Sequence, residues 1–203
     1  MATIKIKGNT VNTSGNLPEV GQKAPDFLLT KTDLSDVSLK DLAGKNVVMN
    51  IFPSVDTSVC SASVRKFNEM ASKFPDTVVL CASLDLPFAH SRFCETEGLK
   101  DVVPVSELRN RQFGEAYGVR ITQGPLTGLL ARAVIILDKK GVVRYSKLVE
   151  ELTNEPNYLE ALDALKHIGE EGGENMEVCT QSNTAEHSRS MNADEPCKDG
   201  RSR

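Results

Sequence analysis

The residues best suited to chemistry lie in one short stretch, Pro53-Ser-Val-Asp-Thr-Ser-Val-Cys60. Apolar residues at helical spacing follow it and predict a helix over residues 58–74, with Cys60 in its first turn and on its apolar side. The N–H groups of a first helical turn have no partner inside the helix, and the helix dipole favours negative charge there. The stretch therefore favours a thiolate, the nucleophilic form of cysteine, at Cys60.

Three further residues fit a site built around a thiolate. Arg132 stands at the edge of the apolar run GLLARAVIIL, where a purely structural strand rarely places a charge, so it is a better candidate cation than Arg65. The hydroxyl of Thr57 can both donate to and accept from a small oxygen ligand beside the sulfur. Pro53 has no N–H and is expected to keep water off one side of the site.

Each of these residues alone also has an ordinary explanation. A lone cysteine on the apolar face of a helix is most often a core residue. Arg132 could lie at the surface, and Thr57 could serve only as a helix cap, as could its neighbours Asp56 and Ser58. Cys81, inside the apolar run TVVLCAS, is predicted to pack in a buried strand. The joint occurrence of proline, threonine and cysteine at this spacing favours the chemical interpretation.

The elements that position these residues follow from the periodicity of the sequence. The predicted strands cover residues 3–15 as a hairpin, 26–30, 47–52, 77–83, 101–106 and a second hairpin at 131–149. The predicted helices cover residues 58–74, 87–98, 106–117 and 154–169, with a brief helical turn at 38–45.

The last helix carries its own boundary signals. Asn154 is the predicted cap, Pro156 falls in the first turn, and Gly169 ends the helix. Its predicted apolar face consists of Leu159, Leu162, Leu165 and Ile168.

This order of strands and helices predicts an α/β fold of the thioredoxin-like type. Strands that alternate with helices form a parallel sheet with helices on its faces, and the second hairpin adds antiparallel strands, so the central sheet is mixed. An N-terminal hairpin stands in front of this order of elements, and the predicted domain, hairpin included, spans residues 1–168. Residues 169–203, which include Cys179 and Cys197, are polar and aperiodic and are predicted to be a disordered tail.

Composition limits the partners of the chain. The net charge is −4 and no block of lysine and arginine occurs, so neither nucleic acid nor a membrane surface is an expected partner. No signal peptide or membrane-spanning segment is apparent, and a soluble, cytoplasmic protein is expected. The five cysteines are widely spaced, and only His90 and Cys94 lie one helical turn apart, so no metal is expected.

These residues also carry a family resemblance. The stretch P-S-V-D-T-S-V-C matches the P-x-x-x-T-x-x-C active-site motif of the peroxiredoxins and closely resembles the form found in their bacterial thiol peroxidase branch, the atypical two-cysteine peroxiredoxins. The similarity continues in SRFCETEGL around Cys94, in GPLTGLLARAVIILD and in LVEELTNEPNY, and it covers residues 1–168.

The resemblance implies a reaction and a role for each site residue. Cys60 corresponds to the peroxidatic cysteine, which attacks hydrogen peroxide or an organic hydroperoxide and becomes a sulfenic acid. Thr57 and Arg132 correspond to the residues that hold the peroxide and the thiolate, and Pro53 to the shielding proline. Cys94 corresponds to the resolving cysteine, which forms the intramolecular disulfide Cys60–Cys94.

The resemblance further implies that thioredoxin reduces this disulfide, that no cofactor is needed, and that the protein is a homodimer, with the loop after Gly118 as one compatible patch. Two other classes of protein remain compatible with these residues. A thiol–disulfide oxidoreductase would share the fold but needs a second cysteine within one turn of Cys60. A non-catalytic module or peroxide sensor would form the sulfenic acid without turnover.

Overall fold

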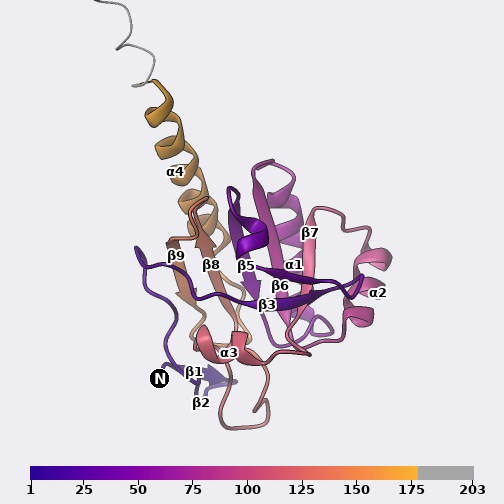
Figure 1. Ribbon diagram of the computed structural model, residues 1–203. Coiled ribbons are helices and arrows are strands. Elements are labelled where there is room, and N and C mark those ends of the chain that lie inside the picture. Colours follow the sequence, from indigo (N-terminus) through magenta and orange to yellow (C-terminus); the bar gives the residue numbers. More distant parts are fainter. Residues whose placement is uncertain (178–203) are drawn as a thin grey trace, which may run out of the picture. The chain divides into compact units, whose positions relative to one another are not determined.

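The computed structural model describes residues 1–177, with side chains as far as Gly169 (Figure 1). The strands are β1 (Thr3–Ile6), β2 (Asn9–Asn12), β3 (Leu28–Lys31), β4 (Asp36–Ser38), β5 (Asn46–Ile51), β6 (Thr77–Ser83), β7 (Val102–Ser106), β8 (Ala133–Leu137) and β9 (Val143–Leu148). The helices are the short 3-10 helix η1 (Lys40–Leu42), α1 (Ser58–Ala71), α2 (Pro87–Glu97), α3 (Gln112–Ala116) and α4 (Tyr158–Glu177).

Seven strands form one mixed sheet in the order β4-β3-β7-β6-β5-β8-β9. The central strands β5, β6 and β7 are parallel to one another. β3 pairs antiparallel with β7 and β8 pairs antiparallel with β5, while the edge strands β4 and β9 pair antiparallel with β3 and β8. β1 and β2 form a separate antiparallel hairpin. The predicted mixed sheet and N-terminal hairpin are therefore both confirmed.

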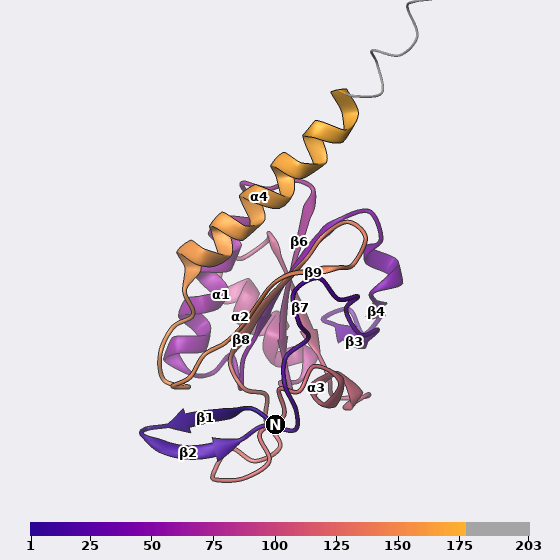
Figure 2. The same ribbon diagram turned by 90° about the vertical axis from the view of Figure 1, so that its left-hand side faces the viewer.

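Two apolar clusters cover the two faces of this sheet. Alternate residues of each central strand point to opposite faces, so Val48 of β5 packs with α1 and α4, whereas Met49 packs on the side of α3. Figure 2 shows α1 and α4 on one side of the sheet and α3 on the other. Every residue of β5 is buried, so this strand lies at the centre of the domain, and the chain runs from its end toward the surface before α1 begins.

The helix α1 begins where the sequence predicts. Thr57 has an extended backbone and is the capping residue, although none of the candidate cap side chains makes a capping hydrogen bond. The buried face of α1 contains Cys60, Ser63, Val64, Phe67, Met70 and Ala71. The helix ends at Ala71, three residues before the predicted end at residue 74.

The predicted helix over residues 106–117 is wrong at its start. Ser106 belongs to β7 and pairs with Ser83 and Thr30 in neighbouring strands. The next residue, Glu107, is fully buried and accepts hydrogen bonds from the Gly114 N–H and from Arg120, so the chain turns here and only Gln112–Ala116 is helical.

The predicted boundaries of the last helix are also wrong. The helix starts at Tyr158, and Asn157 caps it by accepting a hydrogen bond of 3.2 Å from the N–H of Glu160, whereas Asn154 lies in the preceding turn. Pro156 therefore precedes the helix. The buried face contains Ala161, Leu165 and Ile168, while Leu159 is 72% exposed.

The helix α4 also passes through Gly169 and continues to Glu177, so the predicted tail begins inside it. Met1–Gly169 form one compact unit. The prediction for residues 178–203, with Cys179 and Cys197, lies outside the described residues.

The three-residue strand β4 was not predicted, because only Val37 in it is buried.

Candidate active site

Strand pairing brings Cys60 and Arg132 together across the sheet. Ala133, the first residue of β8, pairs with Ile51, the last residue of β5, and α1 follows β5 after a short loop. Cys60 is fully buried, and Nη2 of Arg132 lies 3.4 Å from its Sγ atom. The structure thus brings the guanidinium of a residue 72 positions away in the chain into contact with this sulfur.

Backbone groups hold the side chain of Arg132 in this position. Its Nε and Nη2 atoms donate to the carbonyl oxygen of Leu152 at 3.2 and 3.1 Å. Arg132 is 2% exposed, and its third nitrogen, Nη1, is buried without a hydrogen-bond partner in the described part of the chain. A buried guanidinium donor without a partner is costly, so this atom is well suited to bind an oxygen of a small ligand beside the sulfur.

The loop before α1 is fixed by a carboxylate that sequence reasoning missed. Asp85, which follows β6, accepts hydrogen bonds from Ser54 Oγ at 2.8 Å and from the Val55 N–H at 2.7 Å. Ser83 Oγ donates to the same carboxylate at 2.7 Å. The only signal for Asp85 in the sequence is its position. It stands two residues after Ser83, the last residue of β6, and β6 is the neighbour of β5, the strand that precedes Cys60.

Two predicted residues of this loop differ in their surroundings. Pro53 is buried. Thr57 is exposed, and its hydroxyl donates to the carbonyl oxygen of Ser54 at 3.1 Å. The hydroxyl oxygen keeps its acceptor capacity in this arrangement.

Cys94 lies on α2 and is a half-buried free thiol. Burial raises the pKa of Cys94 to about 11 and that of Cys81, which is fully buried in β6, to about 12. Both are therefore neutral thiols near pH 7. Cys94 and Cys60 contact the same apolar cluster, but they belong to different helices and are not bonded to each other.

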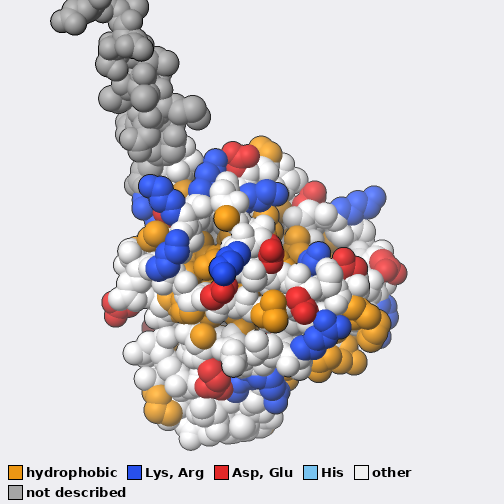
Figure 3. All heavy atoms as spheres, viewed as in Figure 1, with side chains coloured by type: hydrophobic (Ala, Val, Ile, Leu, Met, Phe, Trp, Pro, Cys, Tyr) orange, Lys and Arg blue, Asp and Glu red, His pale blue; other side chains and the backbone are white. Residues whose placement is uncertain are grey.

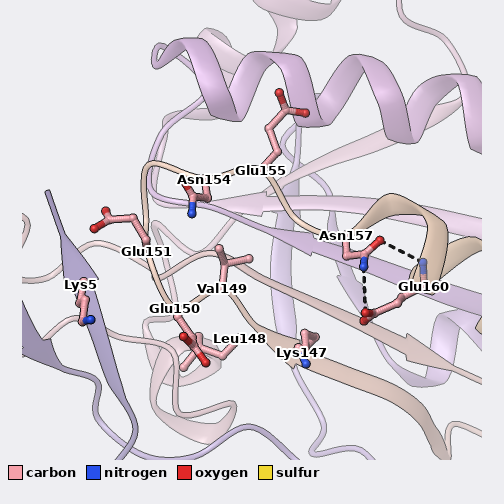
Figure 4. A pocket seen from close by; sticks show the side chains of 10 residues that line it. All are labelled: Lys5, Lys147, Leu148, Val149, Glu150, Glu151, Asn154, Glu155, Asn157 and Glu160. Carbon is pink, nitrogen blue, oxygen red and sulfur yellow. Dashed lines mark hydrogen bonds between the residues drawn. The ribbon is translucent and has the colours of Figure 1, made fainter. Parts of the chain in front are cut away.

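A polar hollow of about 350 Å³ adjoins the segment that carries Leu152, and Figure 4 shows its lining. Neither Cys60 nor Arg132 lines it. Its lining residues are Lys5, Lys147, Leu148, Val149, Glu150, Glu151, Asn154, Glu155, Asn157 and Glu160.

Within residues 1–177, no cluster of three or more histidine, cysteine or acidic side chains could hold a metal ion. None of the helices in that range is long and apolar enough to cross a membrane. On the face shown in Figure 3, acidic and basic side chains are interspersed.

A buried cysteine thus lies in the first turn of α1 on this α/β fold, with a buried arginine against its sulfur. The redoxin family pattern matches residues 19–162. The chain is 52% identical to a thiol peroxidase of Corynebacterium glutamicum and 53% identical to one of Mycobacterium bovis, in each case over 81% of this chain and 99% of the relative.

Solved structures agree with these relatives. A peroxiredoxin-like protein of Aquifex aeolicus superposes with a TM-score of 0.78 at 39% identity, covering 83% of this chain and 98% of that one. A thiol peroxidase of Chromobacterium violaceum shares the fold, with a TM-score of 0.75 at 24% identity over 85% of this chain and 98% of that one. The chain belongs to the peroxiredoxin superfamily, in its thiol peroxidase branch, and the thioredoxin-like fold expected from the sequence is confirmed.

Proposed function

We propose that this peroxidase reduces hydrogen peroxide and organic hydroperoxides with Cys60 as its nucleophile. The observation that carries the proposal is the contact of 3.4 Å between the buried guanidinium of Arg132 and the Cys60 sulfur. In the reaction, the thiolate attacks one peroxide oxygen, the S–O bond forms as the O–O bond breaks, and hydroxide or alkoxide leaves and takes up a proton. Cys60 becomes a sulfenic acid.

Arg132 and the loop before α1 stabilise this step. The Nη1 atom of Arg132, which has no partner among the described residues, donates to the peroxide while Nη2 stays on the sulfur. Such a donor is most effective where negative charge develops on the leaving oxygen. Thr57 binds the peroxide through its hydroxyl, and buried Pro53 excludes water from the sulfur.

Cys94 completes the cycle as the resolving cysteine. Its sulfur attacks the sulfur of the Cys60 sulfenic acid, the S–S bond forms, the S–O bond breaks, and the hydroxyl group leaves as water. A disulfide requires Cα atoms within about 4.4 to 6.8 Å, whereas Cys60 and Cys94 are free thiols on two different helices in this structure. The segment around Cys94 therefore unwinds before the bond forms, and residues 87–98 should lose amide hydrogen-exchange protection in the oxidised protein relative to strand β5.

The proposal includes the remaining partners. Thioredoxin reduces the Cys60–Cys94 disulfide, the reaction takes place in the cytoplasm, and the protein acts as a homodimer without a cofactor. Leu86 and Phe88, at the start of α2, are 49% and 65% exposed and support a self-association surface beside the site. The patch after Gly118 stays a prediction.

A coupled assay tests the proposal directly. Peroxide consumption is followed with thioredoxin, thioredoxin reductase and NADPH, for the wild type and for Cys60→Ser, Cys94→Ser and the control Cys81→Ala. Cys60→Ser should be inactive, and Cys94→Ser should consume about one equivalent of peroxide and stop. Cys81→Ala should retain turnover. Multiple turnover in Cys60→Ser would refute the role of Cys60, and a single turnover in the wild type would identify a sensor instead of an enzyme.

A further inference from the structure

The helix α2 is held by buried hydrogen bonds in its first half. His90 is 1% exposed, and its Nε2 atom lies 2.9 Å from Ser83 Oγ. Ser83 donates its hydroxyl hydrogen to Asp85, which also fixes the loop before Cys60. The first half of α2 and the loop before α1 are therefore anchored to the same group, the half-buried carboxylate of Asp85.

The second half of α2 is held differently. After His90, no residue of the helix is buried, and Phe93 and Cys94 are half-buried. This half is tied to α1 by Arg65, whose Nε and Nη2 atoms contact the two oxygens of Glu97 at 2.8 and 3.1 Å. The Arg65 guanidinium also lies 5.9 Å from the centre of the Phe93 ring. We name the group Arg65, Phe93 and Glu97 the α1–α2 latch.

The latch encloses the segment that the resolving step must move. Phe93 precedes Cys94 directly, Glu97 follows it by three residues, and Arg65 stands on the same helix as Cys60. Cys94 cannot leave its half-buried position with the second half of α2 unless these contacts break. The anchor at His90 lies before this segment, so it can persist while the rest of the helix opens.

We propose that Arg65 and Glu97 are positioning residues of the resolving step, which set how fast Cys94 reaches the oxidised Cys60. The inference rests on the proposed roles of these two cysteines. The latch keeps the second half of α2 folded while peroxide reacts, and its opening precedes the attack of Cys94 on the sulfenic acid. A slower opening leaves the sulfenic acid exposed to a second peroxide, which would oxidise it to a sulfinic acid.

The size of the effect follows from the exposure of the latch. The Arg65 and Glu97 side chains are 42% and 32% exposed, so solvent screens their attraction. Breaking such an exposed pair should change the opening equilibrium by about two- to fivefold. The bidentate geometry and the ring contact favour the upper part of this range.

Single-turnover kinetics test the proposal. One equivalent of peroxide is added to the reduced full-length protein, the reaction is quenched with acid, and mass spectrometry follows the Cys60–Cys94 disulfide over time. Arg65→Met keeps an unbranched side chain but removes the charge, and with it the guanidinium beside the Phe93 ring. Lys66→Met is the matched control, because Lys66 is the next residue of α1 and its ion pair among the described residues is with Glu69 of the same helix.

The disulfide should form about two- to fivefold faster in Arg65→Met and in Glu97→Gln than in the wild type, and at the wild-type rate in Lys66→Met. Added salt should accelerate the wild type but not Arg65→Met, because only the wild type has an ion pair to screen. The exchanged pair Arg65→Glu with Glu97→Arg should restore slow formation. If Arg65→Met formed the disulfide at the wild-type rate and with the wild-type salt dependence, the proposal for the latch alone would be overturned. If the wild type formed no Cys60–Cys94 disulfide, both the proposal for the latch and the proposed function would be overturned.

Discussion

Replacing Arg132 by methionine tests the central contact of the site. The change removes the guanidinium 3.4 Å from the Cys60 sulfur and keeps a buried side chain of similar length. A hydrogen bond to a charged group contributes about 1.5 to 3 kcal/mol, and each 1.36 kcal/mol corresponds to a factor of about ten in rate. The reaction of Cys60 with peroxide should therefore slow by about 10- to 150-fold.

The assay must isolate Cys60, because the chain contains four other cysteines. Alkylation by iodoacetamide is followed by mass spectrometry of the peptide that carries Cys60, at a series of pH values. Without the cation, Cys60 should be alkylated more slowly than in the wild type, because the reacting sulfur loses the guanidinium that lies 3.4 Å from it. Stopped-flow kinetics then measure the peroxide step itself.

Two controls separate electrostatics from folding. Arg132→Met also leaves the carbonyl of Leu152 without two of its donors, which could cost about 1 to 3 kcal/mol of stability, so urea denaturation is measured alongside. Arg132→Lys keeps the charge but loses the planar fork that reaches both Leu152 and the sulfur, and it should be intermediate. Unchanged rates of alkylation and of the peroxide step in folded Arg132→Met would refute the reasoning.

Three further outcomes are expected. Asp85→Asn should lower the free energy of unfolding by about 1 to 3 kcal/mol in urea denaturation and slow the peroxide step, because the loop before Cys60 loses charged acceptors; wild-type values for both would contradict this. Hydrogen bonds from the Gly8 N–H and from Thr153 lower the pKa of Glu151 to about 2. The ionised Glu151 therefore stabilises the folded protein fully above its pKa in the unfolded chain, about 4.3, and this stabilisation is lost as the pH falls toward about 2. The melting temperature of Glu151→Gln should accordingly lie below that of the wild type at pH 7 and converge with it under acid, and a pH-independent difference would argue against the ionised clamp. Removing residues 170–203 should leave activity and melting temperature nearly unchanged, because Met1–Gly169 form one compact unit, and a large loss of either would assign the removed segment a role.

The limits of sequence reasoning are visible at the ends of elements. The interior of α1 followed from its apolar spacing, but the start of α3 did not, because buried Glu107 ends β7 through hydrogen bonds to Gly114 and Arg120. Likewise, Asn154 and Asn157 are both good capping residues by type. Only the backbone path decides that Asn157 caps α4.

The sequence by itself determined the nucleophile candidate, the order of strands and helices, and the charge that would serve the thiol, because these depend on residue type and on local spacing. Tertiary structure alone decided that Arg132 reaches Cys60, since pairing of β5 with β8 joins positions far apart in the chain. It also decided that Asp85 fastens the loop before Cys60 and that Arg65 turns to Glu97. Such contacts arise when the sheet closes and desolvates polar groups, and no local pattern encodes which partners the folded chain then brings together.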